Sequence, residues 1–151
     1  MVSILYCEDE DIARNRAIKV LTREFPAYEV VASESVRSGL EGITKVSLHP
    51  KHLTHISQET ILKRLKAENA SLSNLGIAVT DGNLIDPFAG AGDEYLNGWN
   101  LAQILRGLGY QGKIVYIGFG RIPKGKENLF NQSIPKYDEK SLIRYIRDNL
   151  Q

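Results

Sequence analysis

Acidic side chains follow two apolar segments of the sequence, and a lysine follows a third. Glu8 and Asp9 come directly after the first apolar run, and Asp81 comes directly after a later one. Lys136 stands just beyond a very short candidate strand near the C-terminus. In open parallel α/β sheets, ligands bind where the carboxyl ends of the strands meet. If these segments are parallel strands, the three carboxylates and the lysine are therefore expected at one edge of the sheet.

This set of side chains points to phosphoryl chemistry on a carboxylate. Carboxylates brought together repel one another unless a cation lies among them, and Mg²⁺ suits such a site because it prefers oxygen ligands and keeps several waters. The Lys136 ammonium could pair with a carboxylate or with an incoming phosphoryl oxygen. In-line phosphoryl transfer needs a metal and a lysine to offset charge on the equatorial oxygens. The pattern predicts a Mg²⁺ site formed by Glu8, Asp9 and Asp81.

Alternating strands and helices would position these residues. Apolar and β-branched runs predict strands near residues 2–7, 28–32, 75–80, 113–117 and 132–134. Helical spacing of apolar residues predicts helices over residues 12–25, 58–69, 96–108 and 140–150, and a short one that ends near residue 42. Such alternation favours an α/β fold with parallel strands joined by right-handed crossovers.

Polar residues just before the helical segments are candidate caps. A short oxygen-bearing side chain at this position can accept a hydrogen bond from a free backbone N–H of the first turn. The candidates, in chain order, are Asp9 or Asp11, Ser33 or Ser35, Ser57, and Asp138.

Composition restricts the class of protein. The chain has 151 residues, which fits one domain over residues 1–151, and 42% hydrophobic and 25% charged residues are ordinary for a globular fold. A net charge of +1 gives no electrostatic reason for a nucleic-acid or membrane partner. The single Cys7 rules out an internal disulfide and is expected to be a small buried apolar residue. No segment reads as a membrane span or signal peptide, so a cytoplasmic location is expected.

Residues 44–74 are less regular and are predicted to form a part-helical insertion. The histidines of the chain, His49, His52 and His55, lie here at intervals of three. On one helix the third would rotate away from the shared face, and Pro50 interrupts the segment. We therefore expect a polar surface segment rather than a metal site.

Taken in order, these segments resemble the receiver domains of response regulators. The string ILYCEDEDIARN resembles their opening, where an apolar strand ends in an acid pair. IAVTDGNL resembles the strand that ends in the phosphorylated aspartate, NGWNLAQILR the helix after it, and IPKY holds the place of the family's lysine. The resemblance covers nearly the whole chain. It implies a flavodoxin-like, doubly wound sheet of five parallel strands in the order 2-1-3-4-5, with helices on both faces.

The resemblance also implies a role for each site residue. Glu8 and Asp9 would hold Mg²⁺ together with Asp81, and Asn83 would contribute its backbone carbonyl. Asp81 would accept the phosphoryl group, and Lys136 would pair with it. The implied function is phosphorelay signalling, in which a histidine kinase or phosphotransfer protein supplies the phosphoryl group and the receiver acts on a protein partner rather than as an enzyme.

Three positions depart from the family pattern. The Ser or Thr that follows the fourth strand in the family aligns with Gly118, and the switch aromatic aligns with Ser133. The family's lysine precedes a proline in a cis bond, whereas here Pro135 precedes Lys136 and Tyr137 follows it. A cis bond before a residue other than proline is costly, so this loop is expected to differ.

These departures leave an alternative function open. The chain could be a pseudo-receiver, which is a protein-interaction module that works without phosphorylation. Two other classes fail on chemistry. Haloacid-dehalogenase-like phosphatases, suggested by TDGNLID, would need a nucleophilic aspartate where Val79 stands, and a flavodoxin-type FMN site would place its phosphate against the acids that begin at Glu8.

Overall fold

One parallel sheet runs through the centre of the computed structural model, which describes residues 1–118 and 121–150. Its strands lie in the order β2-β1-β3-β4-β5, and every neighbouring pair is parallel. The strands are β1 (Ser3–Cys7), β2 (Glu29–Ser33), β3 (Leu75–Asp81), β4 (Lys113–Gly118) and β5 (Gln132–Pro135). The predicted strand order is therefore confirmed. The central strands are almost wholly buried, as their continuous apolar sequences indicate.

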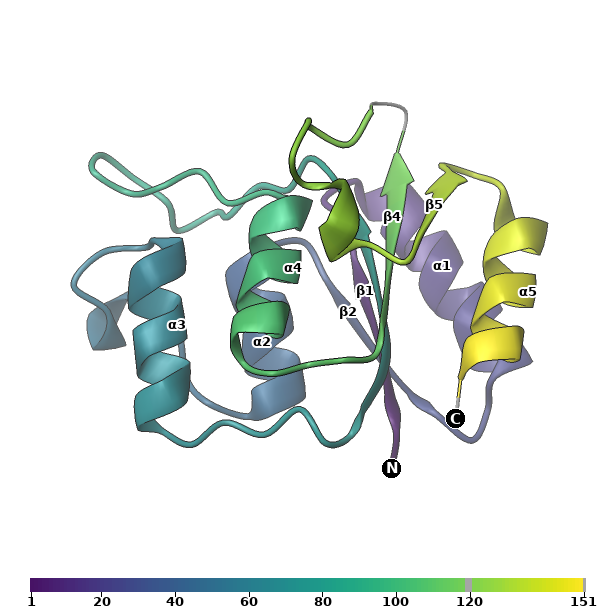
Figure 1. Cartoon of the computed structure of the whole chain (residues 1–151), viewed down its shortest axis with the longest axis horizontal. Helices are drawn as coiled ribbons and strands as arrows, with labels where there is room; N and C mark the ends of the chain where they lie inside the picture. The colour runs from purple at the N-terminus through teal and green to yellow at the C-terminus, as the bar shows by residue number, and fades with distance from the viewer. Residues whose placement is uncertain (119–120, 151) are drawn as a thin grey trace.

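Helices cover both faces of the sheet (Figure 1). On one face lie α1 (Asp11–Glu24) and α5 (Glu139–Asn149), which pack on alternate residues of β1, β3 and β4. On the other face lie α2 (Val36–Thr44) and α4 (Gly98–Gly107). Each strand and helix begins and ends within two residues of its predicted bounds.

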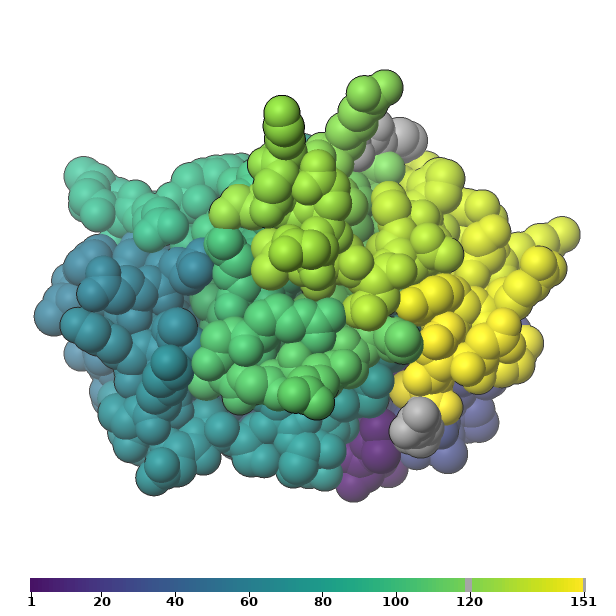
Figure 2. Space-filling model, viewed as in Figure 1, coloured from purple at the N-terminus to yellow at the C-terminus, as the bar shows by residue number. Residues whose placement is uncertain are grey.

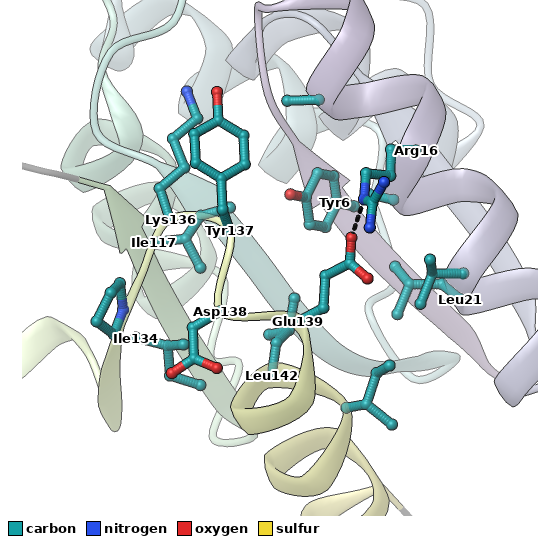
Figure 3. A pocket seen from close by; sticks show the side chains of 15 residues that line it. Tyr6, Arg16, Leu21, Ile117, Ile134, Lys136, Tyr137, Asp138, Glu139 and Leu142 are labelled. Carbon is teal, nitrogen blue, oxygen red and sulfur yellow. Dashed lines mark hydrogen bonds and ion pairs between the residues drawn. The ribbon is translucent and has the colours of Figure 1, made fainter.

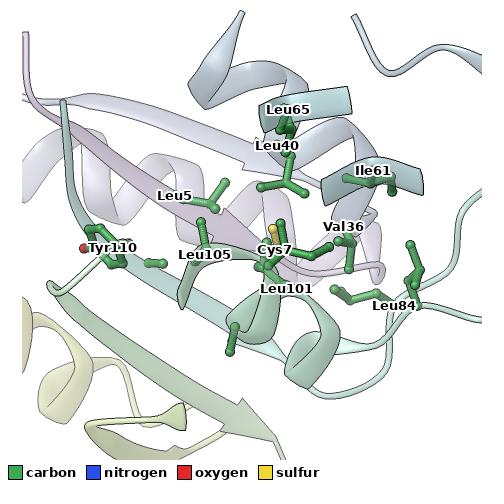
Figure 4. Packing of buried hydrophobic residues seen from close by; sticks show 14 of the residues in the cluster. Leu5, Cys7, Val36, Leu40, Ile61, Leu65, Leu84, Leu101, Leu105 and Tyr110 are labelled. Carbon is green, nitrogen blue, oxygen red and sulfur yellow. The ribbon is translucent and has the colours of Figure 1, made fainter. Parts of the chain in front are cut away.

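The segment predicted as an insertion contains a short 3₁₀ turn (Pro50–His52) and α3 (Gln58–Ala67). Figure 1 shows α3 beside α4, on the side away from the sheet. Its residues Ile61 and Leu65 are fully buried in the larger apolar cluster, together with Leu40, Leu101 and Cys7 (Figure 4). The expectation of a polar surface segment is therefore wrong for this helix, which packs into the core and forms a third layer on this face.

The connection between β4 and β5 holds only a 3₁₀ turn, Glu127–Leu129, among the residues that the structure describes. Leu129 and Phe130 from this connection pack on the apolar cluster around α4. The connections that follow β3 and β4 project from the end of the molecule where the strands terminate (Figures 1 and 2).

Three predicted helix caps are confirmed, and one is wrong. Ser35, Ser57 and Asp138 each accept a hydrogen bond from a backbone N–H of the first turn of α2, α3 and α5. Neither Asp9 nor Asp11 caps α1. Its N-cap residue is Glu10, which makes no side-chain cap. Asp11 is already inside the helix and pairs with Arg14, while Asp9 belongs to the acidic cluster described below.

No helix in the part of the chain that the structure describes is long and apolar enough to cross a membrane.

Candidate functional site

The acidic cluster forms where β1 and β3 end side by side. Cys7 at the end of β1 is in register with Thr80 of β3, so Glu8 and Asp81 leave their strands at the same level. Glu8, Asp9 and Asp81 each bring a carboxylate oxygen within 4.8 Å of the others. Glu8 is fully buried, Asp81 is nearly so, and Asp9 is partly exposed. The structure thus brings together the three carboxylates that the sequence suggested.

Lys136 reaches the same cluster from the connection between β5 and α5. Its Nζ lies 2.7 Å from Glu8 Oε1, 3.1 Å from Asp81 Oδ2 and 3.6 Å from Glu10 Oε2. The side chain is only 10% exposed. The pairing with carboxylates matches the first of the two partners that the sequence suggested for this ammonium.

The cluster holds more negative charge than its lysine offsets. Although Lys136 Nζ is near Glu8 Oε1, neither oxygen of Glu8 accepts a hydrogen bond of good geometry from a described residue. Burial, followed by the neighbouring Asp81 carboxyl, raises the pKa of Glu8 to about 7. Burial opposes the charge of Lys136, but Glu8 and Asp81 together raise the pKa of this ammonium.

A hard divalent cation fits this donor set. The available ligands are carboxylate oxygens, one of them from a buried residue whose oxygens lack hydrogen bonds. Mg²⁺ is bound in proteins by a few carboxylates and retains waters for its remaining positions. The residues present therefore suit the predicted metal.

The backbone around Asp81 is closely packed. Asp81 Oδ1 accepts a hydrogen bond from the N–H of Gly82 at 2.6 Å, and its oxygen Oδ2 accepts one from Lys136. The first residue of α4, Gly98, touches the Asp81 peptide, because a Cβ added to this glycine would lie 2.1 Å from the Asp81 carbonyl oxygen. Sequence reasoning missed Gly98, since a single glycine at a helix start is not a specific signal.

Of the positions that depart from the family pattern, Gly118 lies beside this cluster. A Cβ added at Gly118 would lie 3.2 Å from Asp81 Oδ1, so this glycine is directly beside the candidate acceptor. Ser133 is exposed on β5 and Asn83 is exposed after β3. The described residues contain no cis peptide bond, and Tyr137 adopts a φ of 72°. The Tyr137 hydroxyl lies 3.0 Å from Glu10 Oε1, to which it donates a hydrogen bond.

The other residues singled out in the sequence take no part in this cluster. Cys7 is fully buried, and burial raises the pKa of its thiol to about 12, so it behaves as the predicted apolar residue. His49, His52 and His55 are exposed, as expected. Among the described residues only the acidic trio has the geometry to hold a metal ion.

A small apolar cavity of about 40 Å³ lies beside the cluster, between α1, β5 and α5. Figure 3 shows its wall of Tyr6, Ile117 and Leu142, with Arg16 and Glu139 paired across its mouth. Lys136 and Tyr137 extend side by side from its rim (Figure 3).

Solved structures identify this architecture. The receiver domain of the hybrid histidine kinase CckA is 23% identical to this chain, with 99% of both chains covered and a TM-score of 0.57. The chemotaxis protein CheY4 of Vibrio cholerae is 13% identical, with 99% of both chains covered and a TM-score of 0.60. A response-regulator receiver domain from Clostridium thermocellum is 15% identical over 99% of this chain and 94% of its own, with a TM-score of 0.61.

These likenesses show that the chain has the flavodoxin-like fold of response-regulator receiver domains, as predicted. No family model matches the sequence, and no curated protein matches it.

Proposed function

We propose that this chain is a receiver of two-component signalling that accepts a phosphoryl group on Asp81. The observation that carries the proposal is the meeting of Asp81 with Glu8, Asp9 and Lys136 at the carboxyl edge of a receiver-type sheet. Fold likeness alone would not carry it, because one fold hosts many functions. The chemistry of the cluster supports it.

The reaction is a transfer between a donor nitrogen and a carboxylate oxygen. A carboxylate oxygen of Asp81 attacks the phosphorus of a phosphohistidine on a kinase or phosphotransfer protein. The new O–P bond forms as the P–N bond breaks, and the imidazole nitrogen keeps the electron pair. Lys136, which pairs with Asp81 Oδ2, is placed to pair with a phosphoryl oxygen in the product.

Glu8, Asp9 and Asp81 would hold Mg²⁺, with the backbone carbonyl of Asn83 as a further ligand. When bound, the ion supplies positive charge that offsets the phosphoryl oxygens. The burial of Glu8 excludes water from one side of the cluster and keeps this carboxylate directed at the site. The output is interaction with a protein partner, and the chain carries out no catalysis beyond its own phosphorylation and dephosphorylation.

Intact mass spectrometry after incubation with Mg²⁺ and acetyl phosphate tests this proposal. One phosphoryl adduct is expected, and it should require Mg²⁺. Asp81→Asn should abolish the adduct, whereas Asp148→Asn, which alters an exposed aspartate of α5, should keep it. An adduct that persists in Asp81→Asn would rule out Asp81 as the acceptor.

A second candidate function is a phosphorylation-independent interaction module. Gly118 and Ser133 favour it, because neither position carries the side chain that reports phosphorylation in the family. Trp99 follows Gly98 in the first turn of α4 and can report on the site by its fluorescence. Absence of any adduct, together with no change in Trp99 fluorescence when Mg²⁺ is added, would select this alternative.

A further inference from the structure

The side chain of Tyr116 ends beside the candidate phosphoacceptor. Tyr116 lies on β4 two residues before Gly118, so both face the same side of the sheet. The tyrosine is only 4% exposed. Its hydroxyl oxygen is 2.5 Å from where a Cβ of Gly82 would be, and 3.3 Å from where a Cβ of Gly118 would be. Two glycines that flank Asp81, one in sequence and one on the neighbouring strand, thus make room for one phenol.

The hydroxyl and the Asp81 carboxylate converge on the same point. The position that a Cβ of Gly118 would take is 3.2 Å from Asp81 Oδ1 and 3.3 Å from the Tyr116 hydroxyl. The ring of Tyr116 is held in place by an edge-to-face contact with Phe130, with centroids 5.4 Å apart. The phenol is therefore fixed by packing, with its polar end next to the acceptor.

This hydroxyl has no other task in the structure. It makes no hydrogen bond to any residue that the structure describes, and it is not among the buried polar atoms that lack a partner, so the oxygen itself remains accessible to solvent beside Asp81. An ordinary tyrosine hydroxyl has a pKa of about 10, so the group is a protonated donor throughout the physiological range.

We propose that the Tyr116 hydroxyl donates a hydrogen bond to a phosphoryl oxygen on Asp81, in place of the hydroxyl that Gly118 lacks. This inference rests on the proposed function. Tyr116 and Gly118 are then one unit, because a larger residue at 118 would crowd the phenol oxygen. A phosphoryl group on Asp81 would pull the Tyr116 hydroxyl toward it. The edge-to-face contact with Phe130 would then transmit this movement of the ring to the connection between β4 and β5.

Beryllium fluoride with Mg²⁺ is a suitable probe, because it forms a phosphoryl-like group on aspartate. The change in Trp99 fluorescence during titration gives two separate affinities, one for Mg²⁺ and one for beryllium fluoride in the presence of Mg²⁺, which is called the fluoride complex below. Tyr116→Phe should weaken binding of the fluoride complex by about ten- to a hundredfold, since a hydrogen bond to a charged group is lost. Its Mg²⁺ affinity should stay unchanged, because the hydroxyl is not among the metal ligands.

Two further variants separate a bond to the phosphoryl group from general packing. Tyr110→Phe is the control: it removes the hydroxyl of another buried tyrosine, which donates a hydrogen bond to the Lys113 carbonyl at 3.4 Å, and it should leave both affinities unchanged. In the double variant Tyr116→Phe with Gly118→Ser, the serine must adopt the φ of 158° of Gly118, which strains an L residue, and its Cβ would lie 3.2 Å from Asp81 Oδ1, so its hydroxyl should restore only part of the lost affinity.

The possible failures are distinguishable. If the unaltered protein forms neither a phosphoryl adduct nor a fluoride complex, the proposed function fails and this inference falls with it. If the unaltered protein forms both and Tyr116→Phe binds the fluoride complex equally well, only the inference is overturned. Equal losses of Mg²⁺ and fluoride affinity in Tyr116→Phe would assign the tyrosine a structural role and also overturn it.

Discussion

At the scale of single residues, the charge balance of the cluster depends on Lys136. This ammonium contacts carboxylates that come from two neighbouring strands, Glu8 after β1 and Asp81 at the end of β3. Removing two charges from water is costly unless they are paired closely, and the fully buried Glu8 meets this condition through Lys136. The lysine thus keeps the carboxylates of the two strands together.

Gly98 allows α4 to begin against the end of β3, and replacing it should destabilise the fold. Gly98→Ala would place a methyl group 2.1 Å from the Asp81 carbonyl oxygen, which belongs to the backbone and cannot move cheaply. We expect a loss of about 1–3 kcal/mol in the free energy of unfolding, measured by urea titration. We also expect less phosphoryl adduct, because Asp81 is displaced.

Gly107→Ala is the matched control within the same helix. Its added methyl would lie 3.2 Å from the tip of the Leu62 side chain, which can rotate. Alanine favours a helix over glycine by up to about 1 kcal/mol, and this gain should offset the cost of moving the Leu62 side chain. The free energy of unfolding of this variant should therefore be nearly unchanged. Equal destabilisation by the two substitutions would contradict the close contact of Gly98 with Asp81.

At the scale of elements, the loop after β3 is tied to the inserted segment. Arg37 of α2 donates to both carboxylate oxygens of Asp86, at 2.7 and 3.1 Å, and its Nη1 pairs with Glu41. Further along the loop, Asp93 Oδ1 accepts from the backbone N–H of Ile56, just before α3. The loop that starts at the candidate site is therefore held by α2 and by the insertion.

Arg37→Ala should loosen this arrangement strongly. The side chains of Arg37 and Asp86 are 4% and 9% exposed, so truncation leaves a buried carboxylate without its partner. Such losses cost about 3–5 kcal/mol, which urea unfolding would detect. Arg147→Ala, which breaks an exposed pair with Glu24, should cost at most about 1 kcal/mol. A cost for Arg37→Ala as small as that of Arg147→Ala would show that the loop is held by other contacts.

At the scale of the whole molecule, a cation at the strand ends should stabilise the entire fold. A ligand that binds only the folded state at a hundredfold above its Kd adds about 2.7 kcal/mol. For a chain of this length this corresponds to a rise in Tm of roughly 5–10 °C, measurable by calorimetry with and without Mg²⁺. Glu8→Gln should reduce the rise, because it removes a buried carboxylate of the cluster. An equal rise in Glu8→Gln would place the ion elsewhere.

The sequence alone determined the elements and the edge of the sheet at which the polar residues gather. Two kinds of signal are local, because they depend only on periodicity and on neighbours in the chain. They are the apolar runs that end in Glu8 and Asp81, and the helix caps Ser35, Ser57 and Asp138. From parallel strands it follows that their carboxyl ends coincide. The acidic cluster could therefore be anticipated without coordinates.

Only the tertiary structure decided which side chains from distant segments touch. It placed the Tyr116 hydroxyl between Gly82 and Gly118, brought Gly98 against Asp81, and buried α3 in the core. It also showed that Glu10 rather than Asp9 or Asp11 precedes α1. An aromatic residue two positions before a glycine on one strand was the available sign of Tyr116. Its meaning depends on the register between β3 and β4, because contacts of this kind arise from packing between elements and not from any pattern along one of them.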